Sequence, residues 1–214
     1  MSGAAGSSQW MYASGYEAEQ SLRLDDTRAS HLQFTPAVEG NRRIFTVSAW
    51  IKRSVIQNGT ILSAGADNNN AFRFRFNGAA LQAYDYNGSA NQFDWQVETN
   101  ADLRDHAAWY HVMLAVDTTQ GTNTNRIKLY VNGTLQTDLA TTSYPSQNYD
   151  TEFNQASQVH RLGETHSEDS ALNGYLSEVY LLDGIVGTPS SFGETGTYGE
   201  WKPIEYSGSF GTNG

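Results

Sequence analysis

The sequence predicts an all-β protein that folds as an antiparallel β-sandwich. The main observation is an alternation of apolar and polar side chains in several short segments, which is typical of strands with one buried face. A second observation is the chemistry of the connections, where Asn-Gly pairs follow alternating segments and favour tight hairpins. The chain has 214 residues, a length at which a single sandwich domain is common.

Three segments, residues 45–52, 72–77 and 127–132, show the alternation most clearly. β-Branched and aromatic residues are frequent in them, as expected for strands. In the second segment Arg73 and Arg75 take the face opposite to the apolar residues. The residues expected to face the core are Phe45, Val47, Ala49, Ile51, Phe72, Phe74, Phe76, Ile127, Leu129 and Val131.

The turns between these segments have their own signal. Asn132-Gly133 predicts a two-residue hairpin, because a type I′ turn needs positive φ at both central positions and Asn and Gly tolerate this. Asn77-Gly78 and Asn87-Gly88 repeat the pair at the ends of two further strands. Many short strands separated by such turns predict a sandwich.

The two ends of the chain differ from the middle in composition. Residues 1–15, rich in Ser, Gly and Ala, are expected to form an N-terminal arm, and residues 16–186 the sandwich. Residues 187–214 form a C-terminal arm rich in Gly. A flexible linker lacks aromatic residues at this density, so we expect the arm to pack on its own domain or on a neighbouring subunit or domain, with a disordered arm as the remaining alternative. The aromatic residues expected to make these contacts are Phe192, Tyr198, Trp201, Tyr206 and Phe210.

The charge of the chain excludes one class of partner. The net charge is −10 with 13 Lys and Arg, so the basic surface that nucleic-acid binding requires is missing. No segment approaches the ~20 apolar residues of a membrane-spanning helix, so we expect no membrane insertion. The first residues lack the basic and apolar regions of a signal peptide, and we expect none.

The sequence lacks carboxylates with the spacing of a catalytic pair. Retaining glucanases of sandwich folds place their carboxylates at alternating strand positions, so that two of them face one cleft. After Glu17 and Glu19, Leu22 stands where a third carboxylate would be needed, and Glu164 and Glu168 are interpreted as solvated loop charges. The sequence therefore predicts a non-enzymatic protein, with a polysaccharide hydrolase as a remote alternative.

One region has the composition of a sugar-binding platform, which needs exposed aromatic rings beside amide and carboxylate groups. The residues are Tyr84, Asp85, Tyr86, Asn91 and Trp95. In a strand, Tyr84 and Tyr86 share a face and Asp85 takes the other. The alternative is that the tyrosine face packs in the core, in which case the site is lost.

Two oxygen-rich loops are candidates for Ca²⁺, which prefers carboxylate and amide oxygens. The candidate ligands are Asp67, Asn69, Glu164 and Asp169. Neither loop matches a fixed ligand spacing, so ordinary polar loops are the alternative. No other cofactor is expected. His111, one of five histidines without metal-ligand spacing, is expected to pack and to form a hydrogen bond.

A set of motifs resembles those of laminin-G-like, or concanavalin A-like, jelly-roll domains. The set comprises the strand opener Trp109-Tyr110-His111, the strand end Val131-Asn132-Gly133 and the segment Gly174–Val179. Further segments in the same order resemble such domains in virion proteins of tailed bacteriophages. They are residues 9–14, 19–25, 35–46, 48–53, 115–120, 143–148, 189–195 and 201–214. Ser177 replaces an Asp of the related strand, which weakens any metal role carried over from it.

The resemblance implies a structural protein of the virion surface, such as a capsid decoration or a component of a tail fibre or spike. Other virion proteins, further copies of the chain in a homo-oligomer and host-surface glycans are the implied partners. Such a protein is made in the host cytoplasm and becomes extracellular when virions are released. The alternative is a carbohydrate-binding module for receptor recognition, with or without Ca²⁺, and the chain could be part of a longer protein.

Overall fold

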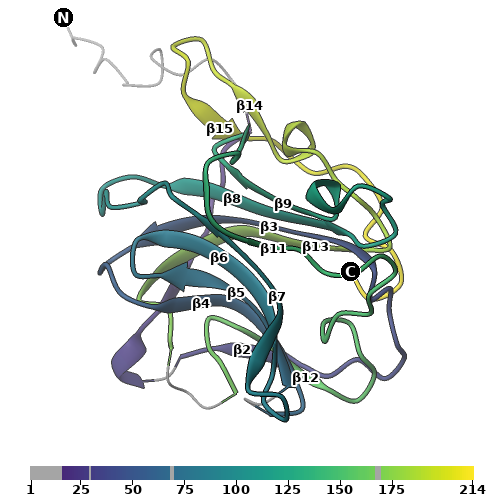
Figure 1. Ribbon diagram of the computed structural model, residues 1–214. Helices are drawn as coiled ribbons and strands as arrows, with labels where there is room; N and C mark the ends of the chain where they lie inside the picture. Colours follow the sequence, from purple (N-terminus) through teal and green to yellow (C-terminus); the bar gives the residue numbers. More distant parts are fainter. Residues whose placement is uncertain (1–15, 29, 68–69, 167–169) are drawn as a thin grey trace, which may run out of the picture.

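Two antiparallel β-sheets pack face to face in the computed structural model of the protein (Figure 1). The structure describes residues 16–28, 30–67, 70–166 and 170–214. Side chains of both sheets meet in one buried apolar cluster, so the predicted antiparallel β-sandwich is confirmed. The predicted N-terminal arm, residues 1–15, lies outside the described part of the chain.

The first sheet, sheet A, joins strands that are far apart in the sequence. Its strand order is β1-β13-β3-β8-β9-β10. The strands are β1 (Leu22–Leu24), β3 (Ile44–Arg53), β8 (Tyr110–Asp117), β9 (Ile127–Val131), β10 (Thr134–Leu135) and β13 (Gly174–Asp183). Because β13 pairs with both β1 and β3, the first strand of the chain lies beside one of the last.

The second sheet, sheet B, has the order β11-β7-β6-β5-β4-β12-β2. Its strands are β2 (Leu32–Phe34), β4 (Gly59–Gly65), β5 (Asn70–Asn77), β6 (Ala80–Asn87), β7 (Gln92–Thr99), β11 (Leu139–Ser143) and β12 (Val159–Leu162). A separate hairpin pairs β14 (Gly193–Thr195) with β15 (Trp201–Pro203). Short 3₁₀ turns occur at η2 (Asp26–Arg28), η3 (Asn123–Asn125) and η4 (Pro189–Ser191).

The core lies between the two sheets and follows the predicted alternation. All residues predicted to face inward are buried there, except that Val131 is partly buried at the edge of the cluster. Arg73 and Arg75 lie on the outer face of sheet B, opposite the three buried phenylalanines of β5. By the same alternation, Trp50 of β3 points to the outer face of sheet A, because Ala49 and Ile51 point into the core.

The hairpin between β9 and β10 has the predicted turn. Val131 pairs with Thr134, and the central residues Asn132 and Gly133 have φ of 47° and 78°, as a type I′ turn requires. Gly133 also lies against the ring of Trp201, because a Cβ placed there would be 2.6 Å from a ring atom. The turn therefore leaves room for a residue of the C-terminal arm.

The C-terminal arm packs on the outer face of sheet A of its own chain. Phe192 and Tyr206 pack with Met113 of β8 and Leu182 of β13 in a second apolar cluster. The carbonyl of Phe210 accepts a hydrogen bond from the backbone N–H of Asp183 at 2.8 Å. Of the two arrangements left open by the sequence, packing on the same domain is therefore present.

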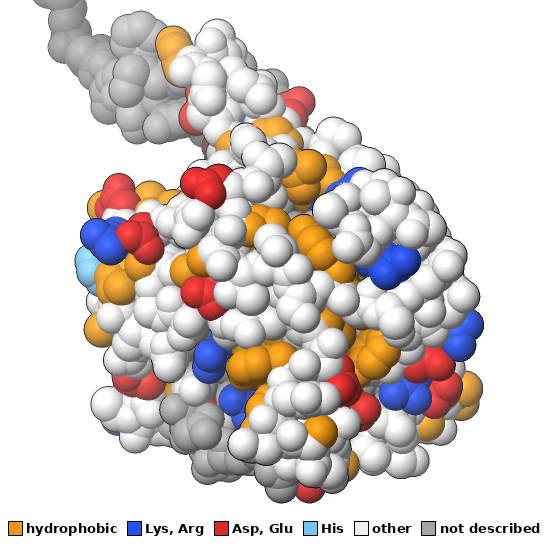
Figure 2. Space-filling model, viewed as in Figure 1, with side chains coloured by type: hydrophobic (Ala, Val, Ile, Leu, Met, Phe, Trp, Pro, Cys, Tyr) orange, Lys and Arg blue, Asp and Glu red, His pale blue; other side chains and the backbone are white. Residues whose placement is uncertain are grey.

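The hairpin of β14 and β15 projects from the body of the molecule, and Tyr198 at its turn is 89% exposed (Figure 1). On the face drawn in Figure 2, acidic and basic side chains are interspersed among polar and hydrophobic ones. Among the described residues, the structure contains no helix with the length and apolar character needed to cross a membrane.

Candidate functional site

The predicted sugar platform is divided between the two faces of sheet B. Tyr84 and Tyr86 lie on the outer face, and Asp85 points the other way, as predicted. Trp95 pairs with Asp85 across β6 and β7, and both residues are fully buried. Burial removes Asp85 and Trp95 from any surface platform, which corrects the prediction for these two residues.

The pairing of β6 with β7 explains why Trp95 is buried. Trp95 lies opposite Asp85 in the regular part of the register, and both side chains enter the core. Beyond this pair a β-bulge shifts the register, so that Phe93 rather than Asp94 lies opposite Tyr86. The ring of Phe93 makes an edge contact with Tyr86 at a centroid distance of 5.4 Å. What remains of the platform at the surface is Phe93 and Asn91, which are exposed, and Tyr86, which is partly exposed. The Tyr86 hydroxyl donates a hydrogen bond to the side-chain oxygen of Asn91 at 2.8 Å.

Tyr84 is covered by polar neighbours rather than open to a ligand. The guanidinium groups of Arg73 and Arg75 lie 6.0 and 5.2 Å from the centre of its ring. Arg75 donates a hydrogen bond to Gln82 at 2.8 Å, and Gln82 in turn donates to Glu98. This network holds the outer face of sheet B in place and leaves Tyr84 almost completely buried.

The two candidate calcium loops lie only partly within the described structure. Asn69 and Asp169 fall outside it, and Asp67 accepts the backbone N–H of Asn70 at 3.0 Å in a tight turn. Within the described residues, no three His, Cys, Asp or Glu side chains come close enough to hold a metal ion. Calcium binding therefore stays a prediction.

Glu164 is buried and not solvated, which corrects the interpretation of this loop charge. One of its carboxylate oxygens accepts the backbone N–H groups of Thr165 at 2.8 Å and Ser170 at 3.3 Å. The carboxylate thereby closes the loop that follows β12, and a structural role explains its presence. Glu168 lies outside the described residues.

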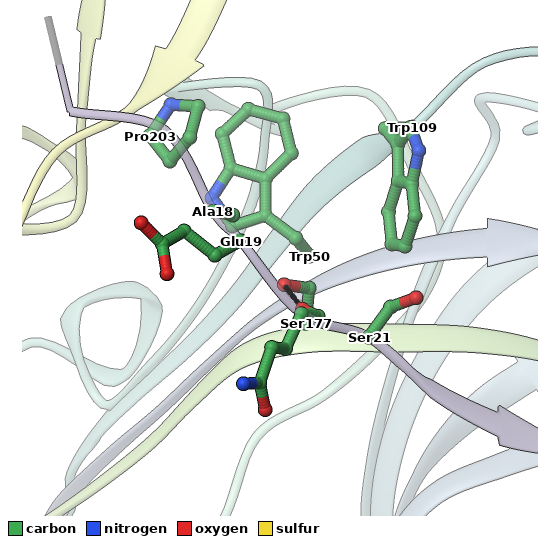
Figure 3. A pocket seen from close by; sticks show the side chains of 8 residues that line it. Ala18, Glu19, Ser21, Trp50, Trp109, Ser177 and Pro203 are labelled. Carbon is green, nitrogen blue, oxygen red and sulfur yellow. Dashed lines mark hydrogen bonds between the residues drawn. The ribbon is translucent and has the colours of Figure 1, made fainter.

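A cavity of about 280 Å³ lies on the outer face of sheet A. We call it the tryptophan pocket; it is lined by residues 18–21, Trp50, Trp109, Ser177 and Pro203. Figure 3 shows Trp109 on one side of Trp50, and Pro203 and Glu19 on the other. The volume is near the lower limit of the ~300–1,000 Å³ typical of small-molecule sites.

The position of each lining residue follows from the pairing of the strands. Trp50 of β3 points outward, and Ser177 of β13 lies opposite it in the antiparallel register. The hydroxyl of Ser177 donates a hydrogen bond to the carbonyl of Gln20 at 2.6 Å, which fixes the N-terminal segment beside the two strands. Pro203 comes from β15, so the pocket joins the two ends of the described chain.

The pocket combines aromatic surface with few polar groups. Trp109 is 37% exposed and has Tyr175 beside it, with ring centres 6.5 Å apart. Trp50 is only 7% exposed, and its indole N–H is buried without a hydrogen-bond partner. Glu19 contributes the carboxylate at the rim. Such a lining suits a small ligand with one apolar face and polar groups at its edges.

A serine–histidine pair lies next to the pocket but cannot act on a ligand. The Ser48 hydroxyl and His111 Nε2 are 2.8 Å apart, and both residues are fully buried. Burial also lowers the pKa of His111 to about 4, and its ring packs against Trp50 at 5.3 Å. The expected packing and hydrogen-bonding role of His111 is confirmed.

The family of the chain follows from its sequence. Residues 25–187 match the laminin G model described as the concanavalin A-like lectin/glucanases superfamily. The chain belongs to this superfamily. The superfamily includes both lectins and glucanases, so membership establishes the fold and leaves binding and catalysis open. A search of curated protein sequences finds no significant match.

Solved structures with the same fold share little sequence with the chain. Domains LG4-5 of the mouse laminin alpha1 chain match with a TM-score of 0.54 and 14% identity, over 92% of this chain and 47% of that one. A heptameric SAP-like pentraxin from Limulus polyphemus matches with a TM-score of 0.51 and 20% identity, over 73% and 71%.

The CBM40 domain of a Ruminococcus gnavus sialidase bound to α2,6 sialyllactose matches with a TM-score of 0.51 and 14% identity, over 80% of this chain and 95% of that one. The fold is thus of the lectin-like type found in laminin G domains, pentraxins and carbohydrate-binding modules.

Proposed function

We propose that this chain is a non-enzymatic, glycan-binding protein of a bacteriophage virion surface, and that the tryptophan pocket holds the glycan. The observation that carries the glycan-binding part is the pocket itself, with two indoles and a rim carboxylate on a lectin-like fold. The apolar C–H face of a sugar ring packs on an indole, while its hydroxyls bond to polar groups around the edge.

Binding without catalysis is supported by the chemistry of the pocket. Glycoside hydrolysis requires two carboxyl groups about 5 to 10 Å apart on either side of the sugar bond. Among the described residues that line the pocket, Glu19 supplies the sole carboxyl group. Release of reducing ends from a bound glycan, abolished by Glu19→Gln, would instead support a polysaccharide hydrolase.

The proposal of a virion protein rests on the ordered motifs that resemble tailed-phage proteins. The proposed roles are capsid decoration or a component of a tail fibre or spike. We propose other virion proteins and further copies of this chain as partners, and the virion surface as the location. Antibodies against the purified protein, applied to intact particles of a phage that encodes it, should label the capsid or the tail in electron micrographs. Unlabelled particles would contradict this setting.

The role of the pocket is tested by Trp109→Ala. Trp109 is partly exposed, so its removal should cost little stability, whereas loss of its ring should weaken glycan binding at least tenfold. The measurement is a glycan array followed by calorimetric titration of the glycans that bind, with and without Ca²⁺. Loss of binding when Ca²⁺ is removed would support the Ca²⁺-dependent receptor-recognition alternative.

The matched control is Tyr198→Ala, which removes an exposed aromatic side chain outside the pocket. This variant should bind as the parent does. An array without any signal in both ionic conditions would contradict the glycan-binding function, and equal affinities of the parent and Trp109→Ala would place the glycan elsewhere.

A further inference from the structure

We infer that the tryptophan pocket selects sugars that carry a protonated amine over sugars that carry a carboxylate. This inference rests on the proposed function and specifies the class of sugar. It is carried by the carboxylate of Glu19, which has no ion pair or hydrogen bond with a described residue and lies beside the indole of Trp50 in an acidic protein.

The lining of the pocket carries one charged side chain, the carboxylate of Glu19. Glu19 forms no ion pair or hydrogen bond with a described residue, although it lies at the rim with Trp50 and Pro203. Lys202, the residue before Pro203 in β15, forms an ion pair with Glu194, with 3.0 Å between its ammonium nitrogen and the carboxylate oxygen. Lys52 of β3, two residues after Trp50 on the same outer face and opposite Tyr175, places a positive charge on the Trp109 side of the pocket. An anionic group is therefore disfavoured at the Glu19 end, where the lining carboxylate and the net charge of −10 of the chain both oppose it.

Arg23, a second cation on this side of sheet A, is also engaged. It donates a hydrogen bond to the side-chain oxygen of Asn173 at 3.0 Å, and its guanidinium group lies 5.2 Å from the ring centre of Tyr175. An incoming carboxylate would have to displace these contacts. An ammonium group at Glu19 displaces nothing.

The aromatic surface favours the same ligand. An indole ring carries negative charge on its faces and attracts a cation placed within about 6 Å of its centre. In Figure 3 Trp50 lies between Glu19 and Trp109. A sugar ring that packs on the indoles therefore has one end at Glu19, where an ammonium group would meet the carboxylate. A carboxylate at this end would be repelled by Glu19.

The inference is tested with three trisaccharides, made of glucosamine, N-acetylglucosamine and galacturonic acid. Calorimetric titration of the purified protein at low salt and slightly acidic pH should show the glucosamine trimer binding about tenfold more tightly than its acetylated form. The galacturonic acid trimer should bind most weakly. The difference between the first two should shrink as salt is added, because the charges lie near the solvent.

Glu19→Gln should abolish the preference, so that the glucosamine trimer binds no more tightly than the acetylated trimer. Glu17→Gln makes the same change of charge in the same segment but outside the pocket lining, and it should keep the preference. Equal binding of the first two trimers by the parent, or a preference for the acidic one, would overturn the inference and leave glycan binding intact. Binding of none of the three, together with an empty glycan array, would overturn the proposed function itself.

Discussion

Asp85 is a buried carboxyl whose ionisation is opposed by its surroundings. Its carboxyl is fully buried between the sheets and accepts the backbone N–H of Glu152 at 3.1 Å. Burial raises the pKa of this carboxyl to about 7, against about 4 in an unfolded chain. Between these two values the folded protein holds a proton that the unfolded chain releases. The stabilisation is therefore complete below pH 4 and is lost as the pH rises towards 7.

Asp85→Asn tests this effect, because asparagine keeps the shape and the acceptor for Glu152 but does not ionise. From pH 5 to pH 8 the free energy of unfolding of the parent should fall relative to the variant by a few kcal/mol, at about 1.4 kcal/mol per pKa unit. Denaturant unfolding at both pH values measures it. Burial lowers the pKa of both His160 and His111 to about 4. Their effect on the pH dependence of stability is opposite in sign to that of Asp85, but it is the same in the parent and in Asp85→Asn and cancels in the comparison. Parallel pH profiles would show that Asp85 ionises normally.

The positions of some single side chains followed from the sequence, and those of others did not. Alternation correctly turned the phenylalanines of β5 inward, because each face of a strand repeats every second residue. The exposure of Trp95 was predicted from composition and is wrong, because Trp95 shares the buried face of β7 with Val97. The bulge that turns Phe93 to the outer face could not be predicted, since no local pattern shows it. The outward position of Trp50 could be derived from Ala49 and Ile51. Its neighbours in the pocket could not, because they come from both ends of the chain.

At the scale of the element, the C-terminal arm covers the outer face of β8. This strand has apolar residues on both faces: Val112 and Leu114 enter the main core, while Met113 and Ala115 point outward. A strand with two apolar faces must be covered on both, so the continuous apolar run in the sequence was a signal for a covering segment. The sequence could not show whether the covering segment belongs to the same chain or to another copy, because the apolar run in β8 does not indicate where its partner residues lie in the sequence.

Phe192→Ala should therefore destabilise the isolated domain by about 3–5 kcal/mol, since a fully buried ring is removed from the cluster on Met113 and Leu182. Thermal and denaturant unfolding measure the loss. Tyr198→Ala, in the same arm but exposed, should change the stability by less than about 0.5 kcal/mol. If both variants matched the parent, the arm would not be packed on sheet A in solution.

For the whole molecule, the charge of −10 sets the conditions under which copies can meet. Like charges repel over roughly 10 Å at moderate salt and over longer distances at low salt. The proposed homo-oligomer should therefore dissociate at low ionic strength and assemble as salt is added. Light scattering from about 0.02 to 0.3 M NaCl should show this rise in mass. A mass that stays at 23.6 kDa throughout would contradict self-assembly.

The joining of the two chain ends at the tryptophan pocket has a mechanical consequence. The three-residue pairing of β1 with β13, the contacts of Arg23 with Asn173 and Tyr175, and the hydrogen bond from Ser177 to Gln20 hold the N-terminal segment beside Trp50. Tension applied to the chain ahead of residue 18 acts on these contacts first, while the long ladders of β3 with β8 and β13 stay closed. Under load the pocket would open before the sandwich yields, and it would re-form when the pull ends. If the pocket holds a glycan as proposed, attachment would be reversible, and the force that it withstands would depend on a three-residue strand.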